Sequence, residues 1–69
     1  MTKANFADYS NGAITALSYI AQSGAPLQSV LDTMQTMVLM LDANTDEGDK
    51  ERFIEAFGAD TLKSAGVLE

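Results

Sequence analysis

The stretch that decides the fold is residues 26–41, PLQSVLDTMQTMVLML, the most apolar window of this 69-residue chain. A strand would need strict alternation of apolar and polar residues, which the stretch lacks. Pro26 suits the first turn of a helix, where its missing N–H would have no partner. The apolar residues instead follow the i, i+3, i+4, i+7 spacing of one helical face, which predicts a helix over about 26–42. That face consists of Leu27, Val30, Leu31, Met34, Met37, Val38 and Leu41.

The end of this stretch, residues 37–41, is a run of five consecutive apolar residues. Such a run covers more than half of the circumference of a helix, and one neighbouring helix in a small chain covers only part of it. Exposed apolar patches usually mark contact sites. Two interpretations therefore stay open. Either the chain wraps this helix fully in its own core, or a second copy or a foreign protein covers part of the apolar surface.

A second apolar pattern precedes the central stretch. Its residues recur at a spacing close to 3.5, which predicts a seam for a helix pair. They are Phe6, Tyr9, Ala13, Ala16 or Leu17, and Ile20. Asn5 is placed to cap this helix, and Gly24 is placed to end it in a left-handed conformation. Because the linker is short, we expect helices over about 5–23 and 26–42 to form an antiparallel αα-hairpin.

The remaining third of the chain predicts one further helix and a short helical turn. Asn44 and Glu47 have the spacing of a capping box, so a third helix is expected over about 45–57. A short C-terminal helical turn is expected over residues 61–65. The sequence thus predicts an all-α fold in one small helical domain that spans residues 1–69.

Charge and composition restrict the partners. The chain has ten acidic and four basic residues, and its formal net charge is −6. Nucleic acids and anionic membranes are bound through positive surfaces, so we expect neither as a partner. The sequence has no run of about 18 apolar residues that would span a membrane and no pattern of a secretory signal. We therefore expect a cytoplasmic protein, located in the host cytoplasm if the chain is phage-encoded.

The residue types of catalytic and metal sites are scarce. The sequence has no cysteine and no histidine, which excludes disulfides and thiolate metal sites. It also lacks a glycine-rich phosphate loop and a serine–base arrangement. We therefore expect a protein that is not an enzyme and that has no catalytic residue and no cofactor.

The segment DANTDEGD, which begins at Asp42, is the one that resembles a metal site. Asp42, Asn44 and Asp46 occupy positions 1, 3 and 5 of an EF-hand calcium loop. Glu47 stands at position 6, where the loop needs glycine, and Phe53 stands at position 12, where it needs a bidentate glutamate. We therefore expect no metal ligand here, and a degenerate calcium loop is kept as a minor alternative.

Together these observations predict a small, acidic, non-enzymatic protein-binding module. Chains of this type are frequent among phage and mobile-element products that occlude or inhibit a host protein. The alternative is a self-assembling structural protein, either a homodimer or a component of a virion or scaffold. The partner is thus expected to be another protein or a second copy of the chain. The expected partner-binding residues are Met34, Met37, Val38, Met40, Leu41, Asp46 and Glu47.

Overall fold

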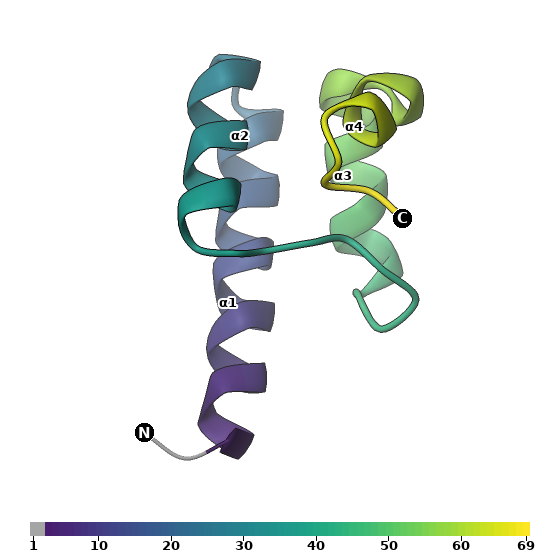
Figure 1. The fold of residues 1–69 in the computed structure, drawn as a ribbon. Helices are drawn as coiled ribbons and strands as arrows, with labels where there is room; N and C mark the ends of the chain where they lie inside the picture. The colour runs from purple at the N-terminus through teal and green to yellow at the C-terminus, as the bar shows by residue number, and fades with distance from the viewer. Residues whose placement is uncertain (1–2) are drawn as a thin grey trace.

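Residues 3–69 are described by a computed structural model, with the side chains from Asp8 onward. In this range the chain forms four helices and no strand: α1 (Lys3–Gln22), α2 (Leu27–Thr36), α3 (Glu47–Phe57) and α4 (Ala59–Ser64). Helices α1 and α2 run antiparallel, α3 packs along α1, and α4 lies beside the end of α3 (Figure 1). The predicted all-α fold, with a helical hairpin, a third helix and a short C-terminal helix, is confirmed. The side chains of Asn5 and Phe6, for which a cap and a seam contact were predicted, lie outside the described residues.

The hydrophobic core lies where α1 meets α2 and α3. All four helices contribute to it, and so do the segments that follow α2 and α4. Burial of these side chains is the main favourable term in folding, at about 25 cal/mol per Å² of apolar surface. The core residues are Ile14, Leu17, Ala21, Val30, Leu31, Met34, Leu39, Leu41, Phe53, Leu62 and Val67.

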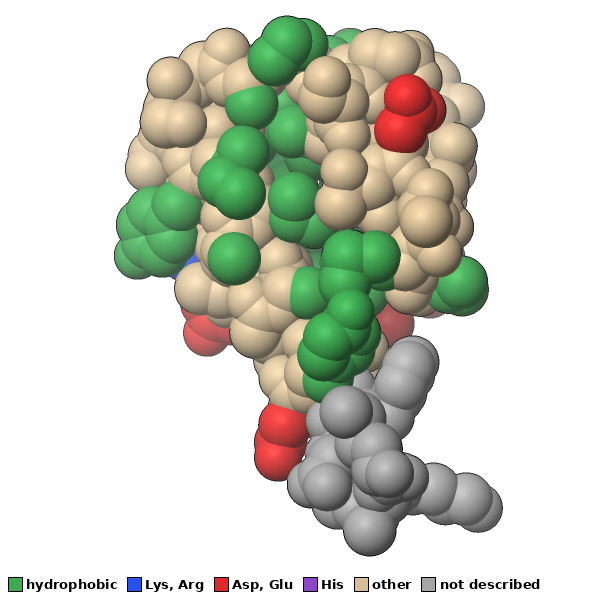
Figure 2. All heavy atoms as spheres, turned by 90° about the vertical axis from the view of Figure 1, so that its left-hand side faces the viewer, with side chains coloured by type: hydrophobic (Ala, Val, Ile, Leu, Met, Phe, Trp, Pro, Cys, Tyr) green, Lys and Arg blue, Asp and Glu red, His purple; other side chains and the backbone are tan. Residues whose placement is uncertain are grey.

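The buried face of α1 matches the predicted seam only in part: Leu17 is buried and Ala13 packs against the core, but the other described seam residues are exposed. Ile14, Leu17 and Ala21 point into the core, whereas Tyr9 and Ile20 of the predicted seam are about half exposed. The helix therefore carries two apolar stripes. The core covers one of them and reaches only Ala13 of the other. Figure 2 shows apolar side chains along the outward side of α1 and α2, where acidic side chains are few.

Three of the helices end in the same left-handed cap. At the ends of α1, α2 and α4 one residue has a positive φ: Gly24 (+103°), Val38 (+56°) and Gly66 (+79°). In each case the N–H of this residue and the N–H of the next donate to the carbonyls three and five residues earlier, as in a Schellman motif. The predicted end of the first helix at Gly24 is confirmed. Glycine adopts this conformation freely, whereas an L-residue with a Cβ pays about 1–2 kcal/mol.

The prediction that the second helix extends over about 26–42 was wrong. Helix α2 ends at Thr36, because the left-handed cap at Val38 turns the chain away from the helix axis. Residues 38–42, which we call the strap, then cross from α2 towards α3 as an irregular, extended segment (Figure 1). The helical spacing of the apolar residues gave no sign of this end, because valine is an unusual residue at such a cap.

Burial alternates along the strap. Leu39 and Leu41 are buried, whereas Met40 between them is 42% exposed, which is the alternation of extended backbone. The Leu41 N–H donates to the Val67 carbonyl (2.8 Å), and the Leu41 carbonyl accepts from the Glu69 N–H (3.0 Å). The strap therefore packs into the core through every second side chain and also holds the C-terminal tail.

The third helix starts at a different cap from the one predicted. Asp46, and not Asn44, is the N-cap of α3, and its carboxylate accepts from two backbone N–H groups of the first turn (3.0 and 3.3 Å). Asn44 lies in the preceding turn, where its N–H donates to the Asp42 carboxylate (2.8 Å). Both residue types are good caps, and the charge of Asp46 is favoured at the positive end of the helix. The last helix also begins earlier than predicted, at Ala59.

Replacement of Val38 by glycine is expected to stabilise the protein. The change removes the left-handed strain of about 1–2 kcal/mol, and the added chain entropy of glycine offsets about 0.5–1 kcal/mol of it. We expect a net gain of somewhat under 1 kcal/mol, measured as a higher midpoint of urea unfolding with an unchanged slope. Gln35→Gly, at an exposed right-handed position of α2, is the matched control and should destabilise by about 1 kcal/mol. Equal destabilisation by both variants would contradict the cap at Val38.

Candidate protein-binding surface

An open hollow of about 450 Å³ lies between the N-terminal half of α1 and the strap. Helix α1 supplies polar side chains and the buried Ile14 to its wall, and the strap supplies apolar side chains. The turn before α3 closes the hollow with polar groups. Its lining consists of Ser10, Asn11, Ile14, Val38, Leu39, Met40, Asp42, Asn44 and Thr45.

The strap presents apolar surface to solvent at the edge of this hollow. Val38 is 83% exposed and Met40 is 42% exposed. Both side chains line the same hollow. A single exposed apolar residue is ordinary, but two that adjoin a hollow form a small contact surface.

A second, polar hollow of about 470 Å³ continues the first one along α1 and α3. The two hollows share Asn11 and Asn44. The second is lined in addition by Thr15, Asp46, Asp49 and Arg52. The surface as a whole therefore changes from apolar at the strap to acidic at the start of α3.

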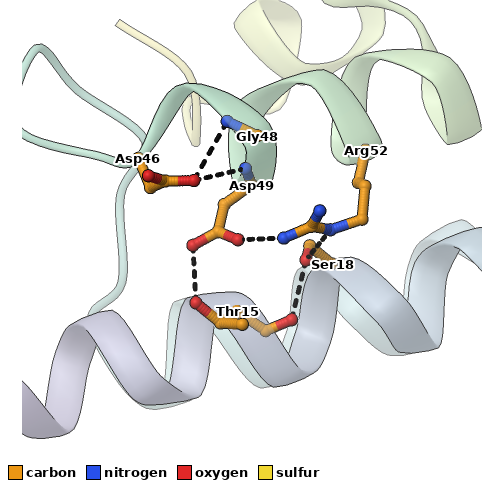
Figure 3. Close-up of polar contacts among 6 residues, drawn as sticks. All are labelled: Thr15, Ser18, Asp46, Gly48, Asp49 and Arg52. Carbon is orange, nitrogen blue, oxygen red and sulfur yellow. Dashed lines mark hydrogen bonds and ion pairs between the residues drawn. The ribbon is translucent and has the colours of Figure 1, made fainter.

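A hydrogen-bonded tie joins α1 to α3 beside the polar hollow (Figure 3). Asp49 is only 4% exposed and accepts hydrogen bonds from the Thr15 hydroxyl (2.6 Å) and from the Arg52 guanidinium. The Arg52 Nε donates to the Ser18 Oγ (2.8 Å), and the guanidinium lies 4.1 Å from the centre of the Tyr19 ring. Each charge of the tie is compensated inside the chain, so the tie connects two helices and leaves no free carboxylate facing a ligand.

The predicted partner-binding residues fall into two groups in the structure. Met34 and Leu41 are fully buried in the core, where a partner cannot reach them while the chain is folded. Met37 is half-buried against the core. Val38 and Met40 are exposed at the apolar hollow, and Asp46 and Glu47 are exposed at the start of α3. Three of the seven residues, Val38, Met40 and Asp46, line the two connected hollows, and Glu47 follows Asp46 without lining either hollow.

Sequence reasoning missed the residues that α1 contributes to this surface. Ser10, Asn11 and Thr15 belong to α1, whereas the strap follows α2, and more than twenty residues separate them from Val38. Their only signal in the sequence is that they are polar residues on a helix whose exposed positions are mostly small or apolar. Which segment faces them is a matter of tertiary packing, and no local pattern reports it.

Within the calcium-like segment, the carboxylates at positions 1 and 5 of the loop accept hydrogen bonds from backbone N–H groups. The Asp42 carboxylate closes the turn at Asn44, and the Asp46 carboxylate caps α3. Among the residues whose placement is described, no three His, Cys, Asp or Glu side chains form a group that could hold a metal ion. No helix in the described range is both long enough and apolar enough to cross a membrane.

Comparisons with known proteins place this chain in no family. No protein-family model matches the sequence, and no curated protein or solved structure matches it.

Proposed function

We propose that this chain is a non-enzymatic protein-binding module that holds an apolar segment of another protein against the strap and its hollow. The observation that carries the proposal is Val38, a β-branched residue that is 83% exposed in a left-handed conformation. The two equivalent caps use glycine, at Gly24 and Gly66. Valine at this position lowers the stability of the isolated chain and adds exposed apolar surface. Strained, exposed residues of this kind gather at ligand contacts, where binding offsets their cost.

The chemistry of the partner follows from the charges beside the hollow. Eight of the ten acidic residues and three of the four basic residues lie after Leu41. Asp42 lines the apolar hollow and Asp46 lines the polar one, while Glu47 is exposed at the start of α3. We therefore infer a partner segment with an apolar side chain for the strap and a neighbouring lysine or arginine for the acidic rim. Opposite charges of this kind speed association and select the partner.

An accessory protein that inhibits a larger host protein would act through these same contacts. A chain of 69 residues covers one patch of its target, and occlusion of that patch is the simplest outcome of binding. A basic, apolar segment on the target would meet both parts of the surface. We therefore include in the proposal the inhibition of a host protein, a role that is typical of phage and mobile-element products.

The proposal is tested by selecting displayed random peptides on the immobilised full-length chain. We expect enrichment of peptides in which an apolar residue adjoins lysine or arginine, with an affinity that falls as salt concentration rises. Val38→Gly should weaken binding of these peptides at least about tenfold, equivalent to about 1.4 kcal/mol, while raising stability. Loss of binding in a stabilised variant cannot come from unfolding.

Ile54→Ser serves as the control, because Ile54 is an exposed apolar residue that does not line either hollow. It should leave peptide affinity unchanged. The proposal fails if the selected peptides bind Val38→Gly as well as the unaltered chain. It also fails if the selected peptides are acidic, or if nothing is enriched over Val38→Gly.

A further inference from the structure

The outward face of α1 is apolar, uncharged and largely exposed, and only its Ala13 packs against the core. Tyr9 is 47% exposed and Ile20 is 46% exposed, while Ala16 between them is exposed and Ala13 is half-buried. These four residues, which we call the outer stripe, lie on one side of the helix, away from the core residue Ala21. Figure 2 shows apolar side chains gathered on this side of the molecule.

The absence of charge around the outer stripe is unusual for an exposed helix. Residues 9–31 contain no aspartate, glutamate, lysine or arginine, although the chain as a whole carries a net charge of −6. Asp8 is the one charged residue of α1 among the described side chains. Ordinary solvent-facing helices carry charged residues opposite their buried stripe. A face without them loses little hydration when a second surface covers it.

The order of side-chain sizes along the outer stripe is the same in both directions. Tyr9, Ala13, Ala16 and Ile20 are spaced by four, three and four residues, with large residues at the ends and small ones in the middle. We propose that a second copy of the chain packs its α1 against this stripe in an antiparallel arrangement, with the two-fold axis between Ile14 and Thr15. Ala13 then faces Ala16 of the other copy, and Tyr9 faces its Ile20. Small central residues let the two helix backbones approach, and a two-fold interface requires such self-complementarity.

The distribution of charge favours a second copy of the chain as the partner and an antiparallel direction of packing. A foreign partner attracted by charge would be drawn to the acidic residues of α3, whereas another copy with the same negative charge can approach only where acids are absent. In the antiparallel pair the two Asp8 residues lie thirteen positions apart along the axis, about 20 Å at 1.5 Å per residue. This exceeds the screening length of about 8 Å at physiological salt. A parallel pair would place the two carboxylates side by side.

We expect the chain to be a monomer at low protein concentration and to dimerise as the protein concentration rises. One helix from each copy buries less than the roughly 800 Å² per partner of a standard stable interface, so the affinity is modest. No residue of the outer stripe lines either hollow, although α1 contributes to both features. Dimerisation and peptide binding are therefore independent properties.

The test is sedimentation equilibrium of the full chain over a wide concentration range, with matched lysine variants. Ala16→Lys places two positive charges near the two-fold axis and should remain monomeric where the unaltered chain is a dimer. Gln22→Lys adds the same charge at an exposed position of α1 away from the stripe and should dimerise normally. Both should show the helical circular dichroism of the folded monomer, because alanine, glutamine and lysine are all good helix formers. A monomeric unaltered chain, or an Ala16→Lys chain that still dimerises, would overturn the proposal.

The direction of packing is tested with cysteines, which the natural chain lacks. A mixture of Tyr9→Cys and Ile20→Cys chains should form a mixed disulfide under mild oxidation. Tyr9→Cys alone should stay unlinked, because its two copies lie too far apart for a disulfide. Rapid linking of Tyr9→Cys to itself would show a parallel pair and overturn the antiparallel arrangement.

Discussion

Replacement of Leu41 by aspartate is expected to leave the chain unfolded at room temperature. Leu41 is fully buried, and truncating a buried leucine alone costs about 2–5 kcal/mol. The new carboxylate would sit in the core without a partner, which adds a large further penalty. A chain of 69 residues has a total stability of about 3–10 kcal/mol, at 0.05–0.15 kcal/mol per residue. Far-ultraviolet circular dichroism should therefore show loss of the helical signal and no cooperative urea transition.

Met40→Asp is the control, one residue earlier on the strap. Met40 is exposed, so this variant should fold with a stability within about 1 kcal/mol of the unaltered chain. The pair separates the extended strap from a continued helix, because on a helix residues 40 and 41 would both lie on the broad apolar face. If both variants unfold, or if Leu41→Asp keeps its helical signal, the alternating burial of the strap is contradicted.

Replacement of Asp49 by alanine is expected to cost about 3 kcal/mol. The change removes the acceptor of both the Thr15 hydroxyl and the Arg52 guanidinium, so a largely buried positive charge loses its counter-charge. Breaking a buried ion pair from one side typically costs 3–5 kcal/mol, and about 3 is expected because the Arg52 side chain keeps 21% of its surface in water. The value is measured from the midpoint of urea unfolding, which should fall while the slope stays constant.

Glu51→Ala is the control for this loss. Glu51 is an exposed acidic residue of the same helix, so its removal should change stability by no more than about 0.5 kcal/mol. A second comparison is Asp49→Ala combined with Arg52→Met, which removes both charges and should recover part of the loss. Equal stability of Asp49→Ala and Glu51→Ala would mean that the tie between α1 and α3 does not hold the helices together.

Sequence spacing predicted the helices well, but it placed their ends well only where glycine marks them. Gly24 ends α1 as expected, since a residue without Cβ is the common solution for a left-handed cap. Val38 ends α2 with the same hydrogen bonds but without that signal, and the predicted helix consequently ran on through the strap. At the start of α3, Asn44 and Asp46 were both acceptable caps, and only the path of the turn decides which carboxylate or amide meets the free N–H groups.

The candidate surface, like the helix ends, could be predicted only in part from local sequence character. Val38, Met40, Asp46 and Glu47 were chosen for their apolar or acidic character, and the first three line the two connected hollows. Met34 and Leu41 were chosen by the same rule and are buried instead. A run of apolar residues shows that some must be buried, but it does not show which, and the polar residues supplied by α1 have no link to the strap in sequence.

The sequence alone determined the helical class of the fold, the end of the first helix at a glycine, and a long uncharged region over residues 9–31. These follow from local rules: side-chain spacing sets which residues share a helical face, and glycine sets where a left-handed turn is cheap. Only the tertiary structure decided that the core buries Ile14, Leu17 and Ala21 of α1 and leaves Tyr9, Ala16 and Ile20 exposed. It also decided that the chain leaves the helix after α2 and continues as an extended segment. Several apolar faces compete for one small core, and the outcome depends on how all of them pack together.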